Sequence, residues 1–419
     1  MTVRWITPLL GTTSASQVGS TSDMTVIDVR ELVDRAGNAA NTLRDKIAAG
    51  SASLRDGRKT VICCDHGISR SNAVAAGVLS QAEGISFEAA IRRVIAATGE
   101  SEMRPEVVEA VRRSLSSSAA ANFPTFERER WLLTGGSGAL GGVIAATTPD
   151  NIEILSPSRE ELDLLRGAVP LGLYTGEAGV SRILHFAAPR IGNTNTAVGE
   201  ALTMFRNVLE VASIQQLPVV IPSRWEVFGG YRGETMEATE ETPSRPAGAL
   251  GDAKYLLEAL ALAWAAQRQA NVTILRSGLV FGNGIAPNFM RAFVRKACSG
   301  ETITTHVYDN GEPLLDLMAA ADWTSAFWAL VRSGETGLFH AGGGALTGTR
   351  EIAEMAAASS GQGCQIAELH VEGKAANVRL DFGKLEKAVG WRPSRPAVDL
   401  LADFLGRACE DRTYTEKDR

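Results

Sequence analysis

Short apolar runs alternate with stretches of helical periodicity along most of the chain. In the first part of the sequence, residues 26–29 and 60–63 have the length and the β-branched content of buried strands. An apolar residue at every third or fourth position, the pattern of an amphipathic helix, occurs at 71–81, 86–98 and 105–115. These elements predict a small α/β domain over residues 1–115.

A segment of small and polar residues, 116–129, contains one proline and predicts a linker. After it the pattern restarts, with strands expected at 131–134, 151–155, 182–186, 218–222 and 272–276, and helices at 139–146, 196–213 and 251–269. Strands separated by helices predict a doubly wound parallel sheet of the Rossmann type. We expect this second domain to span 130–412, with its last hundred residues forming a smaller α+β lobe.

Composition narrows the class of protein. The 419 residues carry a net charge of −6, so a broad basic face for nucleic acid is not expected. No apolar run is long enough to cross a bilayer, and the N-terminal residues do not form a secretory signal. Five scattered cysteines and five dispersed histidines predict neither a disulfide framework nor a metal site. A cytoplasmic location is expected.

The segment 59–72 carries the first candidate site. An apolar strand leads into Cys64, Arg70 follows six positions later, and a helix is expected to begin at Ser71. Gly67 allows the intervening backbone to turn its N–H groups inward, towards phosphate oxygens. The helix N-terminus and the guanidinium favour negative charge at the same place, and therefore the thiolate form of Cys64. A thiolate there can attack phosphorus and form a phosphocysteine.

This segment resembles the dual-specificity branch of the cysteine-dependent protein tyrosine phosphatases, over roughly residues 20–115. The resemblance implies that Ser71 assists departure of the thiolate and that an upstream aspartate is the general acid. Asp34 lies at the expected distance, and Asp28 is the alternative. Cys63 stands where that family usually has histidine. The residues expected to bind the substrate phosphate are Asp65, His66, Gly67, Ile68, Ser69 and Arg70. A phosphate-binding loop without turnover, or a core strand ending in two inert thiols, are the other interpretations.

A second candidate site begins at Thr134. Gly135, Gly138 and Gly141 follow a strand and open a helix, which is the arrangement of a dinucleotide-binding turn. The chain from about 130 to 410 resembles the extended short-chain dehydrogenase/reductase family, which includes sugar-nucleotide epimerases, dehydratases and reductases. The matching segments are 134–141, 185–188, 227–229, 276–282, Asp322 and 389–393. Ser137, Leu140 and Ala187 are further cofactor-binding residues that this resemblance implies.

The cofactor is expected to be NADP or NAD. The second strand of the sheet is followed by Ser156 and Arg159, with no acid to bind a ribose 2′-hydroxyl, which favours NADP slightly. The run 159–165 resembles GDP-fucose synthase-type reductases, in which the acid at the position of Asp163 meets the adenine. Arg159 capping a surface helix is the alternative interpretation.

The catalytic set of this second family is incomplete. Lys254 stands where the family's lysine is expected, binding the cofactor and supporting catalysis, but the tyrosine position is Leu250. Arg224 occupies the position of the family's serine or threonine. Leucine cannot transfer a proton, so carbonyl reduction by the usual route is not expected. Four nearby residues could replace the tyrosine only with altered geometry: Tyr255, Tyr231, Ser223 and Glu226.

The sequence therefore predicts a bifunctional protein. A cysteine-dependent phosphatase precedes an NAD(P)-binding domain that acts on, or senses, a nucleotide-sugar-like metabolite. Two alternatives remain: a sugar-nucleotide oxidoreductase or epimerase whose first domain only anchors phosphate, and an NAD(P)-sensing regulator without fast turnover. The helices at 196–213 and 251–269 are where the resembled family dimerises, and their apolar content fits a homodimer or burial within one subunit.

Overall fold

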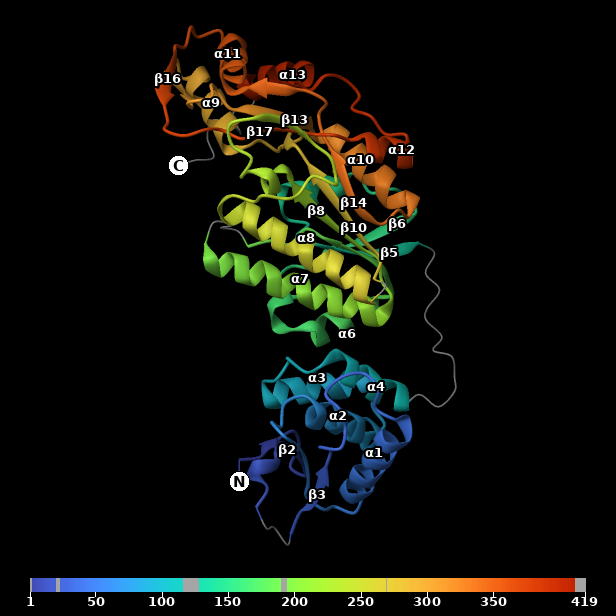
Figure 1. Ribbon diagram of the computed structural model, residues 1–419. Helices are drawn as coiled ribbons and strands as arrows, with labels where there is room; N and C mark the ends of the chain where they lie inside the picture. The colour runs from blue at the N-terminus through green and yellow to red at the C-terminus, as the bar shows by residue number, and fades with distance from the viewer. Residues whose placement is uncertain (1, 20–22, 116–127, 190–193, 269, 411–419) are drawn as a thin grey trace. The chain divides into compact units, whose positions relative to one another are not determined.

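The computed structural model describes residues 2–19, 23–115, 128–189, 194–268 and 270–410 (Figure 1). Contacts divide the chain into two compact units. The first comprises residues 1–130, 157–181 and 206–217, and the second comprises 131–156, 182–205 and 218–419. The predicted linker, 116–129, lies almost wholly outside the described residues, and the predicted domain boundaries stay predictions.

The first unit contains a four-stranded sheet of order β1-β2-β4-β3. Its strands are β1 (Arg4–Trp5), β2 (Leu10–Ser14), β3 (Thr25–Asp28) and β4 (Thr60–Cys64). The central strand β4 pairs in parallel with β2 and β3, and β1 pairs with β2 in the antiparallel sense. Every residue of β4 is buried, which explains its uninterrupted apolar sequence. Both strands predicted here are confirmed.

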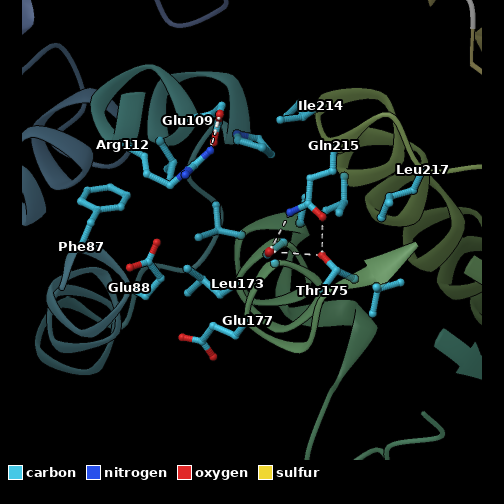
Figure 2. Close-up of a pocket in the computed structure, with 18 of the residues that line it drawn as sticks. Phe87, Glu88, Glu109, Arg112, Leu173, Thr175, Glu177, Ile214, Gln215 and Leu217 are labelled. Atoms are coloured by element: carbon cyan, nitrogen blue, oxygen red, sulfur yellow. Dashed lines mark hydrogen bonds and ion pairs between the residues drawn. The ribbon is translucent and has the colours of Figure 1, made fainter. Parts of the chain in front are cut away.

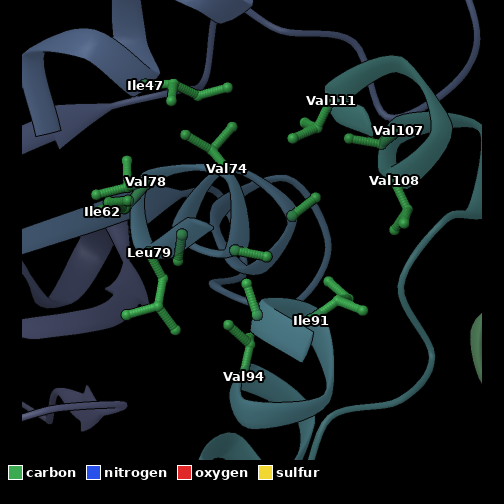
Figure 3. Packing of buried hydrophobic residues seen from close by; sticks show 14 of the residues in the cluster. Ile47, Ile62, Val74, Val78, Leu79, Ile91, Val94, Val107, Val108 and Val111 are labelled. Atoms are coloured by element: carbon green, nitrogen blue, oxygen red, sulfur yellow. The ribbon is translucent and has the colours of Figure 1, made fainter. Parts of the chain in front are cut away.

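Four helices accompany this sheet: α1 (Ala40–Arg55), α2 (Arg70–Glu83), α3 (Phe87–Thr98) and α4 (Pro105–Leu115). Helix α2 packs against all three others and is buried from Arg70 to Leu79. Figure 3 shows Val74 and Val78 of α2 among Ile47 of α1, Ile91 of α3 and Val111 of α4. This packing fixes the end of α2 from which the first candidate site is built.

The three helices predicted in this region are confirmed, but α1 was not predicted. Its buried face includes Leu43, Ile47 and Gly50, together with two serines. A Cβ at Gly50 would lie 2.6 Å from Val78 Cγ2, so α1 and α2 approach closely at a residue without a side chain. A helix that buries small residues has a weak apolar period, which is why the sequence pattern did not reveal it.

A six-stranded sheet of order β14-β10-β8-β7-β5-β6 lies mainly in the second unit. Its strands are β5 (Glu129–Thr134), β6 (Ile152–Leu155), β7 (Val180–His185), β8 (Val219–Arg224), β10 (Val272–Ser277) and β14 (Gly337–Ala341). Strand β8 pairs in parallel with β7 and β10, and β10 pairs in parallel with β14. The chain moves from β5 to β6 on one side and then to β7 on the other, which is the switch in strand order where doubly wound sheets bind ligands. The predicted Rossmann-type sheet is confirmed.

Helices α5 (Ala139–Ala146) and α10 (Ala320–Ser333) share an apolar core with this sheet. That core joins Trp323 and Phe327 of α10 to Leu133 of β5 and Leu275 of β10. Helix α8 (Gly248–Arg268) packs against β8 and β10. These three helices fix the sequence segments that carry the second candidate site.

Helices α6 (Ala168–Ala178) and α7 (Asn195–Gln215) are joined by side-chain hydrogen bonds. Gln215 donates to the carbonyl oxygen of Gly172 over 2.8 Å and accepts from Thr175 Oγ1 over 2.7 Å (Figure 2). The predicted helix at 196–213 is confirmed as α7. The predicted helix at 251–269 is α8, which begins three residues earlier, while residue 269 lies outside the described residues.

Among the described residues, three small sheets and four further helices complete the fold; three of these helices belong to the remaining lobe, and α12 packs against α10 and β14. The sheets are formed by β11 (Leu279–Phe281), β13 (Leu314–Ala319) and β15 (Leu346–Gly348); by β12 (Ile303–Val307) and β16 (Ile366–His370); and by β17 (Asn377–Leu380) and β9 (Thr235–Ala238). The helices are α9 (Asn288–Cys298), α11 (Thr349–Ser360), α12 (Gly383–Val389) and α13 (Ala397–Glu410). The expected α+β lobe is confirmed. Among the described residues, no helix combines the length and apolarity needed to span a bilayer.

Candidate functional site

The first candidate site is the loop between β4 and α2. Strand β4 ends at Cys64 and α2 begins at Arg70, so residues 65–69 form the turn. Gly67 has a φ of +71°, and a Cβ there would lie 2.5 Å from the carbonyl carbon of Thr13 in β2. Glycine is therefore required both by the left-handed backbone and by the close approach of β2.

The sulfur of Cys64 lies at the centre of this loop and is almost completely buried. The backbone N–H of Gly67 donates to Cys64 Sγ over 3.2 Å. The hydroxyl of Ser71 lies 3.4 Å from the same sulfur, within hydrogen-bonding distance. The Gly67 N–H and the Ser71 hydroxyl, which lies in the first turn of α2, therefore place polar groups around the buried sulfur.

Arg70 connects the loop to the segment that follows β3. Its guanidinium donates to the carbonyl oxygen of Leu32 over 2.8 Å and to that of Arg30 over 3.1 Å. It also forms an ion pair with Asp65, although Arg70 itself is only 9% exposed. The guanidinium is therefore held at the loop by the backbone as well as by a carboxylate.

The sequence did not single out Arg4 of β1. Its side chain donates to the carbonyl oxygen of Gly67 and pairs with Glu100 over 2.6 Å. This contact joins the loop to β1 through the carbonyl oxygen of Gly67. No signal in the sequence identifies it, because Arg4 and Gly67 are 63 positions apart and meet only through the sheet.

The two candidate acids have different surroundings. Asp34 Oδ1 accepts a hydrogen bond from Ser69 Oγ over 2.6 Å, which places the carboxylate against the loop between β4 and α2. Asp28 pairs instead with Arg30, and the hydrogen bonds from this guanidinium hold the pKa of Asp28 below its ordinary value. Asp34 contacts the loop directly, and its role as general acid stays a prediction.

The other residues of the loop are divided between core and surface. Asp65 and His66 are exposed and Ile68 is half-buried. Cys63 is buried in β4, and burial raises the pKa of its thiol. Cys63 is therefore expected to stay protonated, and it is a poor second nucleophile.

The second candidate site is the turn between β5 and α5. Gly135 has a φ of +76°, and a Cβ there would lie 2.6 Å from the backbone nitrogen of Ala187. A Cβ at Gly141 would overlap the carbonyl oxygen of Gly135, so the first turn of α5 packs directly on the loop. Gly138 is the N-cap of α5. The close approaches that a pyrophosphate-binding turn requires are therefore present.

Side chains at the ends of β5 and β7 hold this turn in place. Thr134 Oγ1 accepts from the N–H of Ala187 over 3.3 Å and lies 2.9 Å from His185 Nδ1, to which it can donate. Burial, with the nearby charge of Lys254, lowers the pKa of His185 to about 3, so the ring is neutral. Ser137, by contrast, is exposed and Leu140 is half-buried against the core of the sheet.

The residues expected to select the dinucleotide are exposed or locally paired. Ser156 follows β6, and its hydroxyl lies so close to Gly136 that a Cβ there would overlap it. Arg159 is exposed and lies 3.7 Å from Asp163 Oδ1. Asp163 also accepts from the N–H of Leu165 over 3.1 Å, which caps a short 3-10 helix. A preference for NADP stays a prediction.

At the end of β8, the charged side chains of Arg224 and Glu226 lie close enough to Lys254 to affect its pKa. Lys254 donates to the carbonyl oxygen of Pro222 over 3.1 Å. Burial lowers the pKa of Lys254 to about 8, and the guanidinium of Arg224 acts in the same direction. Arg224 is itself paired with Glu226 over 2.7 Å. Leu250 is 37% exposed and offers no group that exchanges a proton.

The other possible proton donors are occupied or directed elsewhere. Tyr231 donates its hydroxyl proton to the carbonyl oxygen of Pro243 over 2.8 Å. Tyr255 is 40% exposed, on the part of α8 that faces away from the lysine. Ser223 is buried, and within the described residues its hydroxyl has no hydrogen-bond partner. Of the four possible replacements for the tyrosine, Glu226 is the one that forms an ion pair with Arg224.

Comparison with known proteins identifies the family and the fold of this second part of the chain. The sequence model of the NAD dependent epimerase/dehydratase family matches residues 131–341. The fold is similar to dTDP-glucose 4,6-dehydratase from Bacillus anthracis in complex with NAD (TM-score 0.59, 19% identity, 68% of this chain and 98% of that one). It is also similar to RMD from Pseudomonas aeruginosa complexed with NADPH (TM-score 0.59, 20% identity, 69% and 99%). UDP-N-acetylglucosamine 4-epimerase from Bacillus cereus is a third similar structure (TM-score 0.56, 17% identity, 67% and 96%).

No curated protein sequence matches the chain. The family match covers half of the chain and includes the glycine turn, β7 and the helix that carries Lys254. The family description names NAD, which confirms the class of cofactor that the glycine turn predicts. The chain belongs to the NAD dependent epimerase/dehydratase family.

Proposed function

We propose that this protein hydrolyses phosphomonoesters through Cys64 and binds NAD(P) together with a nucleotide-sugar-like metabolite at its second site. One observation carries the first half of the proposal: the buried sulfur of Cys64 receives the N–H of Gly67 over 3.2 Å and lies 3.4 Å from Ser71 Oγ. An ordinary core cysteine has no need of such donors, whereas a nucleophilic thiolate does.

In the first step the thiolate attacks phosphorus. A bond forms between Cys64 Sγ and phosphorus as the bond from phosphorus to the leaving oxygen breaks, and the proton of the Asp34 carboxyl passes to that oxygen. Arg70 and the N–H groups of residues 65–69 stabilise the negative charge on the three equatorial oxygens. The product of this step is a phosphocysteine and a free alcohol.

In the second step water hydrolyses the phosphocysteine. Asp34, now ionised, takes a proton from water while the water oxygen bonds to phosphorus and the sulfur–phosphorus bond breaks. The sulfur leaves as a thiolate, which Gly67 N–H and Ser71 Oγ stabilise. Inorganic phosphate is released and the starting protonation state is restored.

At the second site, the glycine turn and the N-terminus of α5 would hold the pyrophosphate of NAD(P). When bound, the nicotinamide could accept or donate a hydride. The chain offers Lys254 and Glu226 near the crevice, but Leu250 removes the usual proton donor. We therefore propose binding of a nucleotide-sugar-like ligand here, with slow redox turnover or none. The similarity to a dTDP-glucose 4,6-dehydratase and a UDP-N-acetylglucosamine 4-epimerase supports this class of ligand.

Two measurements test the proposal. Hydrolysis of p-nitrophenyl phosphate should be detectable in the full chain and lost in Cys64→Ser, whereas Cys364→Ser should be unaffected because Cys364 lies outside the loop. Equilibrium titration with NADPH and NADH should show saturable binding. Binding without hydrolysis would leave the phosphate-anchoring or NAD(P)-sensing alternatives, and hydrolysis without binding would contradict the role of the second site.

A further inference from the structure

The hydroxyl of Ser69 lies between the phosphate loop and the candidate general acid. Ser69 is the last residue before α2, and its carbonyl oxygen accepts from the N–H of Ala73 over 3.0 Å, so the helix fixes its backbone. Its residue surface is only 8% exposed. The Ser69 side chain is therefore packed within the loop and has little contact with solvent.

The direction of the hydrogen bond to Asp34 can be derived. Ser69 Oγ accepts from the backbone N–H of Arg104 over 3.0 Å. A hydroxyl has a single hydrogen, and here it points to Asp34 Oδ1, 2.6 Å away. Ser69 is thus the donor, and Asp34 Oδ1 is the acceptor. The proton that Asp34 transfers as an acid is then carried on its other oxygen, Oδ2.

The segment that carries Asp34 is joined to the phosphate loop at a second point. Arg70 donates to the carbonyl oxygens of Arg30 and Leu32, which are four and two positions before Asp34. After Asp34, Asn38 accepts from the N–H of Val33 and donates to its carbonyl oxygen, each over 2.8 Å, which closes the turn. The backbone is fixed by these contacts, and the remaining freedom is the rotation of the Asp34 side chain. The hydrogen bond from Ser69 Oγ to Asp34 Oδ1 restricts that rotation.

We infer that Ser69 is a positioning residue, which holds Asp34 Oδ1 so that Oδ2 delivers its proton to the leaving oxygen. This inference rests on the proposed phosphatase function and adds to it a residue that sets the orientation of the acid. Both hydrogen bonds of the Ser69 hydroxyl are made within the protein, to Asp34 Oδ1 and from the Arg104 N–H. Its effect on the rate is exerted through Asp34.

The inference is tested by varying the leaving group. Phenol is a much weaker acid than p-nitrophenol, so phenyl phosphate depends on proton donation and p-nitrophenyl phosphate depends on it far less. Ser69→Ala should lower kcat for phenyl phosphate by about 10- to 100-fold, a part of the usual contribution of a general acid. For p-nitrophenyl phosphate the loss should be less than about threefold, because donation matters little there.

Three further variants make the result specific. Asp34→Asn should show the same dependence on the leaving group, and the double variant should be no slower than Asp34→Asn alone. Ser69→Thr keeps the hydroxyl and should restore hydrolysis of phenyl phosphate. Ser80→Ala is the matched control, because Ser80 lies near the other end of α2 and donates to the carbonyl oxygen of Ile85, away from the loop.

The possible outcomes separate this inference from the proposed function. Equal losses on both esters, or no loss on either, would overturn the role of Ser69 while leaving a phosphatase that depends on Cys64. Additive losses in the double variant would also overturn it. If the unaltered protein hydrolyses neither ester, the proposed function fails and the inference falls with it.

Discussion

The two loops of this protein use the same physical device and differ in what accompanies it. Each is a glycine-containing turn between a parallel strand and a helix N-terminus. A Cβ at Gly67 would overlap the backbone of Thr13 in β2, and a Cβ at Gly135 would overlap the backbone of Ala187, just after β7. The loop after β4 carries the buried thiol of Cys64 and the guanidinium of Arg70, and its Ser69 contacts the carboxylate of Asp34. The turn after β5 has the close glycine contacts of a dinucleotide-binding turn. Near Lys254, however, Leu250 stands in place of a proton donor. The shape of such a turn can therefore be present with or without side chains that can exchange protons beside it.

The largest expected effect comes from removing the planar guanidinium of the first loop. Arg70→Lys should lower kcat/KM for p-nitrophenyl phosphate by roughly 10³-fold, because an ammonium cannot make paired hydrogen bonds to two phosphate oxygens. Steady-state kinetics measures the loss. Arg58→Lys is the control, since Arg58 forms an exposed ion pair with Asp56. A loss of less than tenfold would mean that charge alone suffices and that the loop resembles the passive second turn.

The next effect tests the second turn through two neighbouring glycines of α5. Gly141→Ala should weaken NAD(P) binding by about 10- to 100-fold, because the added methyl group overlaps the carbonyl oxygen of Gly135 and displaces the turn. Gly142→Ala should bind normally, since a Cβ there would be 3.6 Å from its nearest neighbour. Fluorescence titration measures both. Equal affinity in the two variants would contradict the close-packed turn, and altered phosphatase activity would show that the two sites are coupled.

Acidification should distinguish the stabilities of the two units. Burial lowers the pKa of both His185 and His340 from 6.5 to about 3, so between these pH values the unfolded chain binds more protons than the folded one. The free energy of unfolding of the second unit should therefore fall as pH is lowered through this range, by an amount on the order of a few kcal/mol. Asp316, whose pKa burial raises to about 7, opposes part of this loss because it is protonated in the folded state above pH 3.8.

The first unit contains one histidine, His66, on an exposed loop, and it should lack this loss. Hydrogen exchange followed by mass spectrometry can compare peptides from β4 and α2 with peptides from β7 and β14 between pH 7 and about pH 4. Faster exchange confined to the second set is the expected result. Simultaneous destabilisation of both sets would refute the comparison.

The smallest effect comes from restoring the missing group. Leu250→Tyr places a phenol one helical turn before Lys254, whose depressed pKa makes it a suitable proton partner. Stability should change by less than about 0.5 kcal/mol because Leu250 is well exposed. We expect a slow change in nicotinamide absorbance with nucleotide sugars, which Leu250→Phe should lack. Equal turnover in the unaltered protein would show that Glu226 or another group already replaces the tyrosine.

The sequence determined by itself the elements whose residues have a strong periodic pattern. Strand β4, helices α2 and α3, and the alternation from β5 to β10 all follow from apolar spacing, and the two glycine turns follow from their position between strand and helix. The residue types at 64, 70 and 71 and the leucine at 250 are also readable without a structure. Local pattern and local chemistry suffice for these features because each depends on residues that are close in the chain.

Tertiary structure alone decided which distant residues meet. Helix α1 was missed because it buries glycine and serine against α2 and so lacks an apolar period. Arg4 reaches Gly67 only because β2 lies between β1 and β4 in the sheet. Ser69 was expected to bind the substrate phosphate, and the sequence did not indicate that its side chain contacts Asp34, 35 positions away, while accepting from the Arg104 N–H. The spacing of residues along the sequence does not predict such contacts, because they depend on how whole helices and strands pack against one another.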